Sequence, residues 1–213
     1  PTGTSDLIIK AVRDNLLLPG KLLDMGCGAG INGITLNKLG LVKGPIFASD
    51  ISSKAVHCAK ENAKLHKCAI NAREGSLFEP WYGETFDYII NDVSGVANAV
   101  AQISPWFDGV PCFSGNDGTE LICKILDQSP EYLNKHGALF FPVLSLSKIE
   151  NILNKAKKVF SVVKPLIKQT WPMPKSMMKH SDFLLKLADD GLIQIEHSYG
   201  TLLWTTEIYV AKV

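Results

Sequence analysis

The chain has 213 residues, of which 46% are hydrophobic, and this length supports one domain with a substantial core. Its 22 Lys and Arg residues balance 21 Asp and Glu residues, and the net charge of +1 argues against a general polyanion-binding surface. Five cysteines without a CxxC pair indicate neither a disulfide framework nor a metal site, and they favour a reducing cytoplasm.

Helices and strands are predicted to alternate from residue 5 onward. We expect helices at residues 7–16, 32–39, 52–67, 96–103, 119–134 and 148–157, and strands at residues 21–25, 45–49, 69–73, 86–90, 138–143 and 159–164. Residues 104–116 read as a loop. Strands that alternate with helices predict a parallel sheet with helices on both faces.

The pattern changes after Pro165. Residues 171–174 read as irregular, residues 181–188 as a helix, and residues 192–197 and 202–213 as two β-rich segments joined by a hairpin turn at residues 198–200. We expect one domain, residues 1–213, with a C-terminal elaboration over residues 165–213. No apolar run reaches the length of a membrane span, so no membrane partner is expected. The start at Pro1 leads us to expect that an N-terminal piece is missing.

Three alternating glycines follow the first predicted strand in the stretch "LLDMGCGAG", residues 22–30. In open α/β sheets, ligands bind beyond the carboxyl ends of the strands, near this first strand-to-helix turn. Gly28, Gly30 and Gly33 also fit the GxGxxG pattern of dinucleotide sites, and Asp50 follows at the expected distance. However, Gly28 comes two residues late for that pattern, and the Asp24 carboxylate suits an ammonium group better than a pyrophosphate.

The same stretch resembles the first motif, hxhDhGxGxG, of the class I S-adenosylmethionine-dependent methyltransferases. The resemblance covers residues 20–145 and implies a Rossmann-like, seven-stranded, mostly parallel sheet with an antiparallel C-terminal strand. It implies S-adenosylmethionine as the cofactor, with Asp24 facing the methionine ammonium. The glycine loop, Gly26, Cys27, Gly28 and Gly30, would pass against the cofactor.

Two further segments are predicted cofactor contacts by this resemblance. Asp50 would accept hydrogen bonds from both ribose hydroxyls, and Ile51 follows it in the same turn. In "REGSLFEP", residues 73–80, Ser76 stands where family members often carry an acid for the adenine amino group. Leu77 or Phe78 either covers the adenine ring or belongs to the core.

The methyl acceptor is expected after the fourth predicted strand, in "FDYIINDVSGV", residues 86–96. Amino-methyltransferases carry Asn/Asp-Pro-Pro-Tyr/Phe here, and its acceptor oxygens hold the N–H groups of the substrate. Only Asn91 matches that motif, because Asp92, Val93 and Ser94 replace the other three residues. We expect Asn91 to position the acceptor and to adjoin the cofactor, and Asp92 to serve as a second acceptor or as a base.

A second stretch, residues 113–141, resembles the segment after that tetrapeptide in the protein-glutamine N5-methyltransferases. Gly115, Asp117 and Gly118 match the Gly-x-Asp-Gly turn that opens a long helix. The first six residues lie where that group has a proline-led lid. Trp106, Phe107 and Phe113 either line a substrate pocket or anchor their loop to the core.

The sequence therefore predicts transfer of a methyl group to an amino or amide nitrogen of a protein or small molecule. O-methylation of a small molecule and methylation of an RNA base are alternatives, with nucleic acid the less favoured partner. An NAD-dependent oxidoreductase and a non-catalytic cofactor-binding subunit remain open, as does the oligomeric state.

Overall fold

The computed structural model describes residues 2–16, 18–107, 112–198 and 200–213. Its helices are α1 (Gly3–Asn15), α2 (Ile31–Lys38), α3 (Ser53–Leu65), α4 (Asn98–Ile103), α5 (Glu120–Tyr132), α6 (Ile149–Val159), α7 (Lys175–Met178) and α8 (Ser181–Asp189), with short 3-10 turns η1 (Glu79–Trp81) and η2 (Pro105–Phe107). Its strands are β1 (Leu22–Met25), β2 (Ile46–Asp50), β3 (Ile70–Glu74), β4 (Phe86–Asn91), β5 (Leu133–Leu144), β6 (Val162–Pro172), β7 (Glu196–Ser198) and β8 (Thr201–Lys212). Pro1, Tyr199 and residues 108–111, which fall within the predicted lid, hairpin turn and loop, lie outside the described part of the chain.

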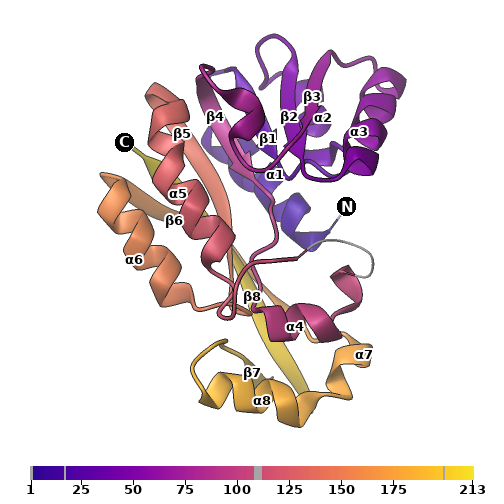
Figure 1. The fold of residues 1–213 in the computed structure, drawn as a ribbon, viewed down its shortest axis with the longest axis vertical. Coiled ribbons are helices and arrows are strands. Elements are labelled where there is room, and N and C mark those ends of the chain that lie inside the picture. The colour runs from indigo at the N-terminus through magenta and orange to yellow at the C-terminus, as the bar shows by residue number, and fades with distance from the viewer. Residues whose placement is uncertain (1, 17, 108–111, 199) are drawn as a thin grey trace.

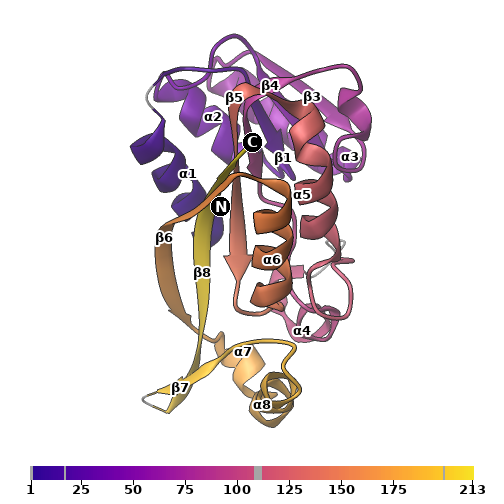
Figure 2. The same cartoon turned by 90° about the vertical axis from the view of Figure 1, so that its left-hand side faces the viewer.

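The strands form one mostly parallel sheet in the order β3-β2-β1-β4-β5-β8-β6, with β7 paired to β8 (Figures 1 and 2). Strands β1 to β5 run parallel, whereas β8 is antiparallel to both β5 and β6. The predicted α/β class and the antiparallel closing strand are thus confirmed. The sheet has eight strands rather than seven, because the predicted hairpin adds the short β7 beyond the main sheet.

The alternation of apolar side chains along the strands explains why both faces of the sheet are covered. Leu23, Ile89 and Phe141 pack in the core beneath α5 and α6. Their neighbours in sequence, Leu22 and Ile90, pack on the opposite face beneath α1 and α2. Strands buried on both faces read as continuous apolar runs, which is why the sequence shows short hydrophobic blocks here.

The predicted ends of two strands were wrong: β5 begins at Leu133 rather than at residue 138, and β6 extends through Trp171 and Pro172 rather than stopping at residue 164. Strand β6 lies at the edge of the sheet, and its pairing with β8 shifts register between Pro165 and Ile167. Proline is tolerated on edge strands and at bulges, so Pro165 interrupts the pattern without ending the strand. The β-rich segment predicted at residues 192–197 is shorter than expected, since only Glu196–Ser198 pairs with β8.

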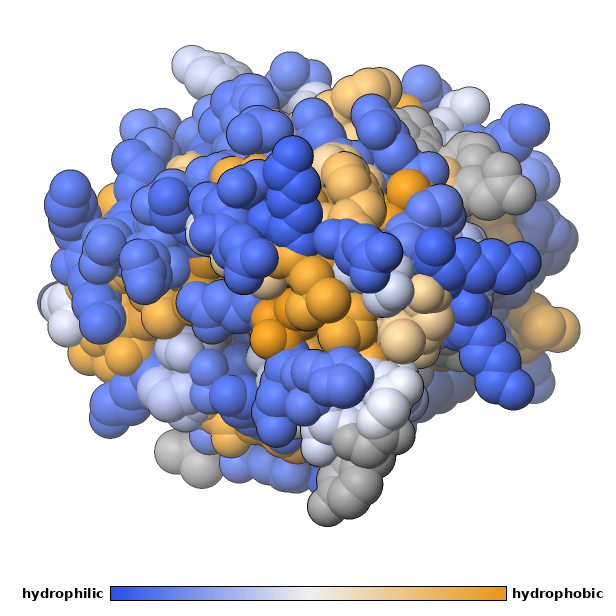
Figure 3. Space-filling view, turned by 90° about the horizontal axis from the view of Figure 1, so that it is seen from below, coloured by the Kyte–Doolittle hydropathy of each residue, from blue (hydrophilic) through white to orange (hydrophobic). Residues whose placement is uncertain are grey.

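Beyond the sheet, α7, α8 and β7 form a C-terminal lobe around the far end of β8 (Figure 1). A separate apolar cluster holds it together and includes Met177, Leu184 and Trp204 together with Val100 of α4. Figure 3 looks onto this end of the molecule and shows an apolar patch among hydrophilic residues. On α8, Phe183 and Leu185 are 41% and 40% exposed. No helix in the described ranges combines the length and the apolar character that crossing a bilayer requires.

Candidate active site

The topological switch point of the sheet lies between β1 and β4. Strands β2 and β3 lie on the β1 side of this point, and β5, β8 and β6 lie on the β4 side. Met25 and Asn91, the last residues of these strands, are directly paired. A cavity of about 880 Å³ opens beside them and is lined by the turn after β1, the end of β2, the loop after β4 and the start of α1. This is the position and the size expected of a small-molecule site in an open α/β sheet.

The three glycines of the first turn serve different purposes. Gly26 has a φ of +72°, and a Cβ there would lie 2.9 Å from the backbone nitrogen of Val93. Gly30 has a φ of +81°, and its Cβ would meet Ala59 of α3 at 3.2 Å. At Gly28, with a φ of +51°, a Cβ would meet nothing within 4 Å. Gly26 and Gly28 line the cavity, whereas Gly30 does not, so Gly30 serves helix packing instead.

Asp24 lies beneath the glycine turn rather than in the cavity. Its side chain is fully buried, and its Oδ2 accepts a hydrogen bond from the backbone N–H of Gly33 at 2.9 Å. Its Oδ1 has no partner among the described residues. Burial raises the pKa of Asp24 to about 7, although the Gly33 N–H opposes that shift. Asp24 therefore forms a buried link between β1 and α2, and its expected contact with the cofactor stays a prediction.

Asp50 lies at the cavity wall and joins the glycine turn to the end of β2. Its Oδ2 accepts from the N–H of Gly28, and its Oδ1 accepts from the N–H of Ser52, each at 2.9 Å. Each carboxylate oxygen keeps a second lone pair for another donor. Ile51 also lines the cavity and is 59% exposed, so an apolar side chain is available beside these oxygens.

The segment after β3 places Ser76 and Leu77 in the cavity wall. Leu77 has a φ of +48° and follows Gly75, where a Cβ would lie 2.5 Å from Pro80. Phe78 is only 2% exposed and stacks on Tyr132 of α5 at 4.3 Å. The alternative left open by the sequence is thereby decided, because Leu77 faces the cavity and Phe78 belongs to the core. Cys27 lines the cavity too, and burial raises the pKa of its thiol, which stays protonated.

The side chains of Asn91 and Asp92 lie in different environments. Asn91 is the last residue of β4, is 1% exposed, and its Oδ1 accepts from the N–H of Val93 at 2.9 Å. It does not line the cavity, whereas Asp92 does. A Cβ on Gly26 would lie 3.0 Å from the carbonyl carbon of Asp92, so Asp92 is immediately beside the glycine turn. The structure therefore places Asp92, but not the side chain of Asn91, in the cavity wall, and the roles expected of both residues stay predictions.

Two buried side chains hold the Asp92 carboxylate. Ser5 of α1 donates its hydroxyl to Oδ2 at 2.7 Å, and the amide nitrogen of Asn32 donates to the same oxygen at 3.1 Å. Burial raises the pKa of Asp92 to about 6, and these two hydrogen bonds oppose the shift. Asp92 can therefore change its protonation state near neutral pH.

The Gly-x-Asp-Gly turn is structural rather than part of the cavity wall. Asp117 Oδ1 accepts from the N–H and the hydroxyl of Thr119, and its Oδ2 accepts from the amide of Asn151 on α6. A Cβ on Gly118 would lie 2.5 Å from the backbone nitrogen of Ala97. The turn therefore fixes the start of α5 against α6 and the loop that leads to α4.

Comparison with known proteins agrees with this geometry. The family model described as "Methyltransferase small domain" matches residues 2–92. A putative protein N5-glutamine methyltransferase of Methanocaldococcus jannaschii is 32% identical over 162 residues, which cover 74% of this chain and 77% of the relative. The chain belongs to the S-adenosylmethionine-dependent methyltransferases. Its relatives include proteins named for N5-glutamine methylation and for ribosomal protein L11 methylation.

Other relatives of the methyltransferase are longer than this chain. The release factor glutamine methyltransferase of Geobacter sulfurreducens is 28% identical, over 72% of this chain and 55% of the relative. The ribosomal protein L11 methylase structure from Lactobacillus delbrueckii subsp. bulgaricus has a TM-score of 0.61 and an identity of 18%, covering 99% of this chain and 79% of that one. This second likeness confirms the fold of the methyltransferase.

The residues present fit the cofactor that the methyltransferase family implies. Asp50 offers two carboxylate oxygens beside the apolar side chains of Ile51 and Leu77, which match a ribose diol next to a flat adenine. The backbone at Gly28 is open to the cavity, where a Cβ would meet nothing. These features suit a nucleoside that carries an amino acid end.

The sequence did not reveal several residues of the methyltransferase cavity. Ser5 and Asn32 hold Asp92, and Trp171 and Trp204 line the wall opposite the glycine turn together with the predicted Trp106, Phe107 and Phe113. Residues 2–5 line the cavity as well, at the position of the predicted lid. These side chains come from α1, α2, β6 and β8, which are distant in sequence, so no local pattern could have grouped them.

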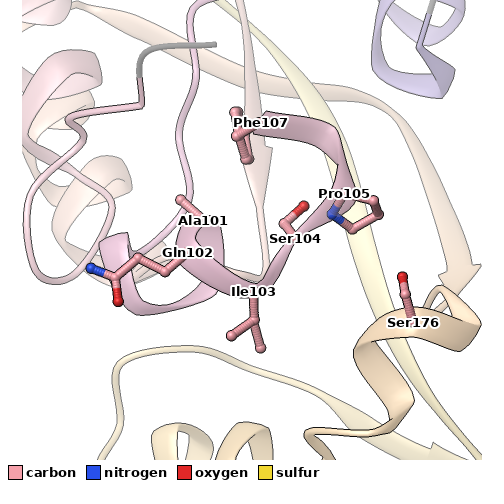
Figure 4. Close-up of a pocket in the computed structure, with 7 residues that line it drawn as sticks. All are labelled: Ala101, Gln102, Ile103, Ser104, Pro105, Phe107 and Ser176. Carbon is pink, nitrogen blue, oxygen red and sulfur yellow. The ribbon is translucent and has the colours of Figure 1, made fainter. Parts of the chain in front are cut away.

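A second cavity of about 500 Å³ is lined by residues of α4, of η2 and of α7. Ala101, Gln102 and Ile103 line it from α4, and Ser176 points from α7 toward the turn at Pro105 (Figure 4). Phe107 borders both this second cavity and the main cavity of the methyltransferase. The loop containing Phe107 therefore separates the two spaces.

Proposed function

We propose that this chain transfers the methyl group of S-adenosylmethionine to a nitrogen atom on a protein or small molecule. The observation that carries the proposal is the Asp92 carboxylate, which lines the cavity directly beside the turn at Gly26. The relatives named for glutamine methylation support a nitrogen acceptor on a protein. Family membership sets aside the NAD-dependent alternative.

The roles of the residues follow from their places in the cavity. Asp50 would accept the ribose hydroxyls while the amides of Gly28 and Ser52 hold its carboxylate in position. Ile51 and Leu77 would flank the adenine, with Ser76 near its polar edge. The bound cofactor supplies a methyl group on a positively charged sulfur, which is a good leaving group.

Asp92 would orient the acceptor nitrogen and take its proton. Ser5 and Asn32 both donate to Oδ2, so Oδ1 is the carboxylate oxygen that is left to face the acceptor. A carboxylate held at one oxygen cannot swing away, and this restraint fixes the direction of the other oxygen. Asn91 would act indirectly, because its bond to the Val93 N–H shapes the loop that presents Asp92.

The cofactor assignment is tested by thermal unfolding with added ligand. S-adenosylhomocysteine at 100 times its Kd should stabilise the chain by about 2.7 kcal/mol, whereas NAD should not stabilise it. Asp50→Asn, which removes the charge facing the ribose, should weaken binding by roughly tenfold or more. Stabilisation by NAD alone would overturn the proposal.

Enzymatic transfer is tested by incubating the protein with methyl-labelled cofactor and an extract of cells that lack it. Label should enter the protein or small-molecule fraction, and Asp92→Ala should abolish this incorporation while leaving the S-adenosylhomocysteine shift in place. Label confined to RNA would contradict the proposed acceptor. All five cysteines are free thiols, which supports a reducing cytoplasm as the place of action.

A further inference from the structure

The charges that line the main cavity are all negative. Among the described residues of its wall, Asp50 and Asp92 are the charged side chains, and no Lys, Arg or His takes part. Asp50 lies at the end of β2, and the proposed function assigns its free lone pairs to the ribose of the cofactor. Asp92 is therefore the charge available to the methyl acceptor, and a phosphate or carboxylate on that acceptor would meet no cationic side chain here.

Five aromatic side chains also line the cavity. Trp106 and Phe107 come from η2, Phe113 from the loop before α5, Trp171 from β6 and Trp204 from β8. The rings of Trp106 and Trp204 lie 5.0 Å apart, and those of Trp171 and Trp204 lie 6.3 Å apart, so the three indoles form one continuous surface. Indole faces carry negative electrostatic potential and attract cations.

The first turn of α1 connects the aromatic wall to the carboxylate. A Cβ on Gly3 would lie 2.8 Å from the ring of Trp171, so the backbone of α1 rests on this indole. Two residues later, the Ser5 hydroxyl bonds to Asp92 at 2.7 Å. The indole wall and the carboxylate thus adjoin the same helical turn, on which Gly3, Thr4 and Ser5 all border the cavity.

From this juxtaposition we infer that the acceptor is an aliphatic amine, which binds as its ammonium ion between the indole wall and Asp92, rather than a carboxamide. The inference rests on the proposed methyl transfer and names its substrate class. A carboxamide can donate its N–H groups to a carboxylate, but it has no positive charge for the indoles or the carboxylate to attract. An ammonium ion satisfies both surfaces at once.

The atoms and charges of this reaction balance with Asp92, the ammonium ion and the cofactor alone. Asp92 accepts one proton from the ammonium ion, which leaves a neutral amine with a free lone pair. The nitrogen lone pair attacks the methyl carbon, so that an N–C bond forms as the C–S bond breaks and the sulfur keeps the electron pair of that bond. The products are a protonated N-methylamine and neutral S-adenosylhomocysteine, and the proton on Asp92 passes to solvent. Burial raises the pKa of Asp92 to about 6, so the carboxylate is ionised at neutral pH and can hold this proton briefly.

The chemical stability of the product distinguishes the two acceptors. Protein labelled in the extract experiment is hydrolysed in strong acid, which cleaves an N-methyl amide to labelled methylammonium but leaves the C–N bond of an N-methylated amine intact. The hydrolysate is then made alkaline, so that any methylamine becomes volatile. We expect the label to stay in the non-volatile fraction and to co-chromatograph with N-methylated amines; the same is expected of any labelled small molecule. Release as methylamine would overturn the amine assignment and uphold nitrogen methylation. Absence of incorporation, with S-adenosylhomocysteine bound, would overturn the proposed function itself.

A matched pair of variants tests the indole wall. Trp106 is 37% exposed, so its replacement should not threaten the core. Trp106→Leu removes the aromatic face and should raise the apparent KM for the acceptor, measured by serial dilution of the extract, by roughly 3- to 30-fold. Trp106→Phe keeps an aromatic face and should raise it much less, and both variants should keep the S-adenosylhomocysteine shift. Equal effects of Leu and Phe would contradict cation binding by the wall.

Discussion

Asn91 and Asp92 show how the end of a strand decides which side chain reaches the cavity. The sequence placed the end of the fourth strand at residue 90, which made Asn91 the first side chain beyond it. The strand actually ends at Asn91, whose side chain is buried, and Asp92 is the first residue free to face the cavity. Strand ends depend on pairing with β1 as well as on local sequence, so a shift of one residue cannot be read from the sequence.

The glycine turn permits a test at the residue scale. Gly28→Ala should cost about 1–2 kcal/mol for its left-handed backbone and should weaken S-adenosylhomocysteine binding, because the added methyl group enters open cavity space. Gly26→Ala should cost about 1–3 kcal/mol more, since its methyl group meets the backbone at Val93. Urea unfolding and calorimetric titration measure both effects. Similar stability losses in the two variants would contradict this division of roles.

Burial of Asp24 predicts a dependence of stability on pH. Its pKa is raised to about 7 in the folded chain, above the ordinary value near 4, so the native state holds a proton that the unfolded state releases. This contribution to stability is fully present below pH about 4 and is lost as the pH rises to about 7. Asp24→Asn keeps an acceptor for the Gly33 N–H but removes the titration.

The measurement for Asp24 is the free energy of unfolding at several pH values between 4 and 8. The wild-type value should fall with rising pH more steeply than that of Asp24→Asn. Parallel curves for the two proteins would show that Asp24 titrates normally.

At the scale of elements, α1 contributes to the site as well as covering the sheet. Its N-cap, Thr2, accepts from the N–H of Ser5, and the Ser5 hydroxyl then reaches Asp92, which lies 87 positions away in the sequence. The start of α1 is thereby fixed against the loop after β4. Hydrogen bonds to charged groups contribute about 1.5–3 kcal/mol, which is enough to hold a helix end in place.

A double-mutant cycle tests this link between α1 and the loop. Ser5→Ala and Asp92→Ala should each lower the free energy of unfolding, and the double variant should lose less than the sum of the two by about 1 kcal/mol. Ser5→Ala alone should also slow methyl transfer, because Asp92 loses one of its two restraints. Additive losses of stability would show that the hydrogen bond contributes nothing.

For the whole molecule, the strands that lead into the C-terminal lobe complete the cavity wall. Strand β8 continues past β5 and carries Trp204 into the apolar cluster that includes Leu184 of α8. β6 follows it and carries Trp171, which pairs with Trp204. The sheet thus extends beyond the cofactor half to form a wall against which a substrate can bind (Figure 2).

Two neighbouring leucines on α8 test the dependence of the acceptor side on this lobe. Leu184 is fully buried, and Leu184→Ala should cost about 2–5 kcal/mol and slow methyl transfer more than it weakens S-adenosylhomocysteine binding. Leu185 is 40% exposed, and Leu185→Ala should change stability by no more than about 0.5 kcal/mol. Thermal unfolding and transfer assays compare the two. Equal losses of cofactor binding and transfer in Leu184→Ala would contradict a separate acceptor side.

The sequence by itself determined the alternating order of strands and helices, the glycine turn and the position of Asp50, because each depends on residues close together in the chain. Only the tertiary structure decided that Asp92 rather than Asn91 reaches the cavity, that Asp24 lies beneath it, and that Trp171 and Trp204 complete its wall. Those contacts join residues from opposite ends of the chain, and the pairing of β8 between β5 and β6 is what brings them together. Local sequence patterns carry no information on such pairings, since these are chosen by burial across the whole sheet.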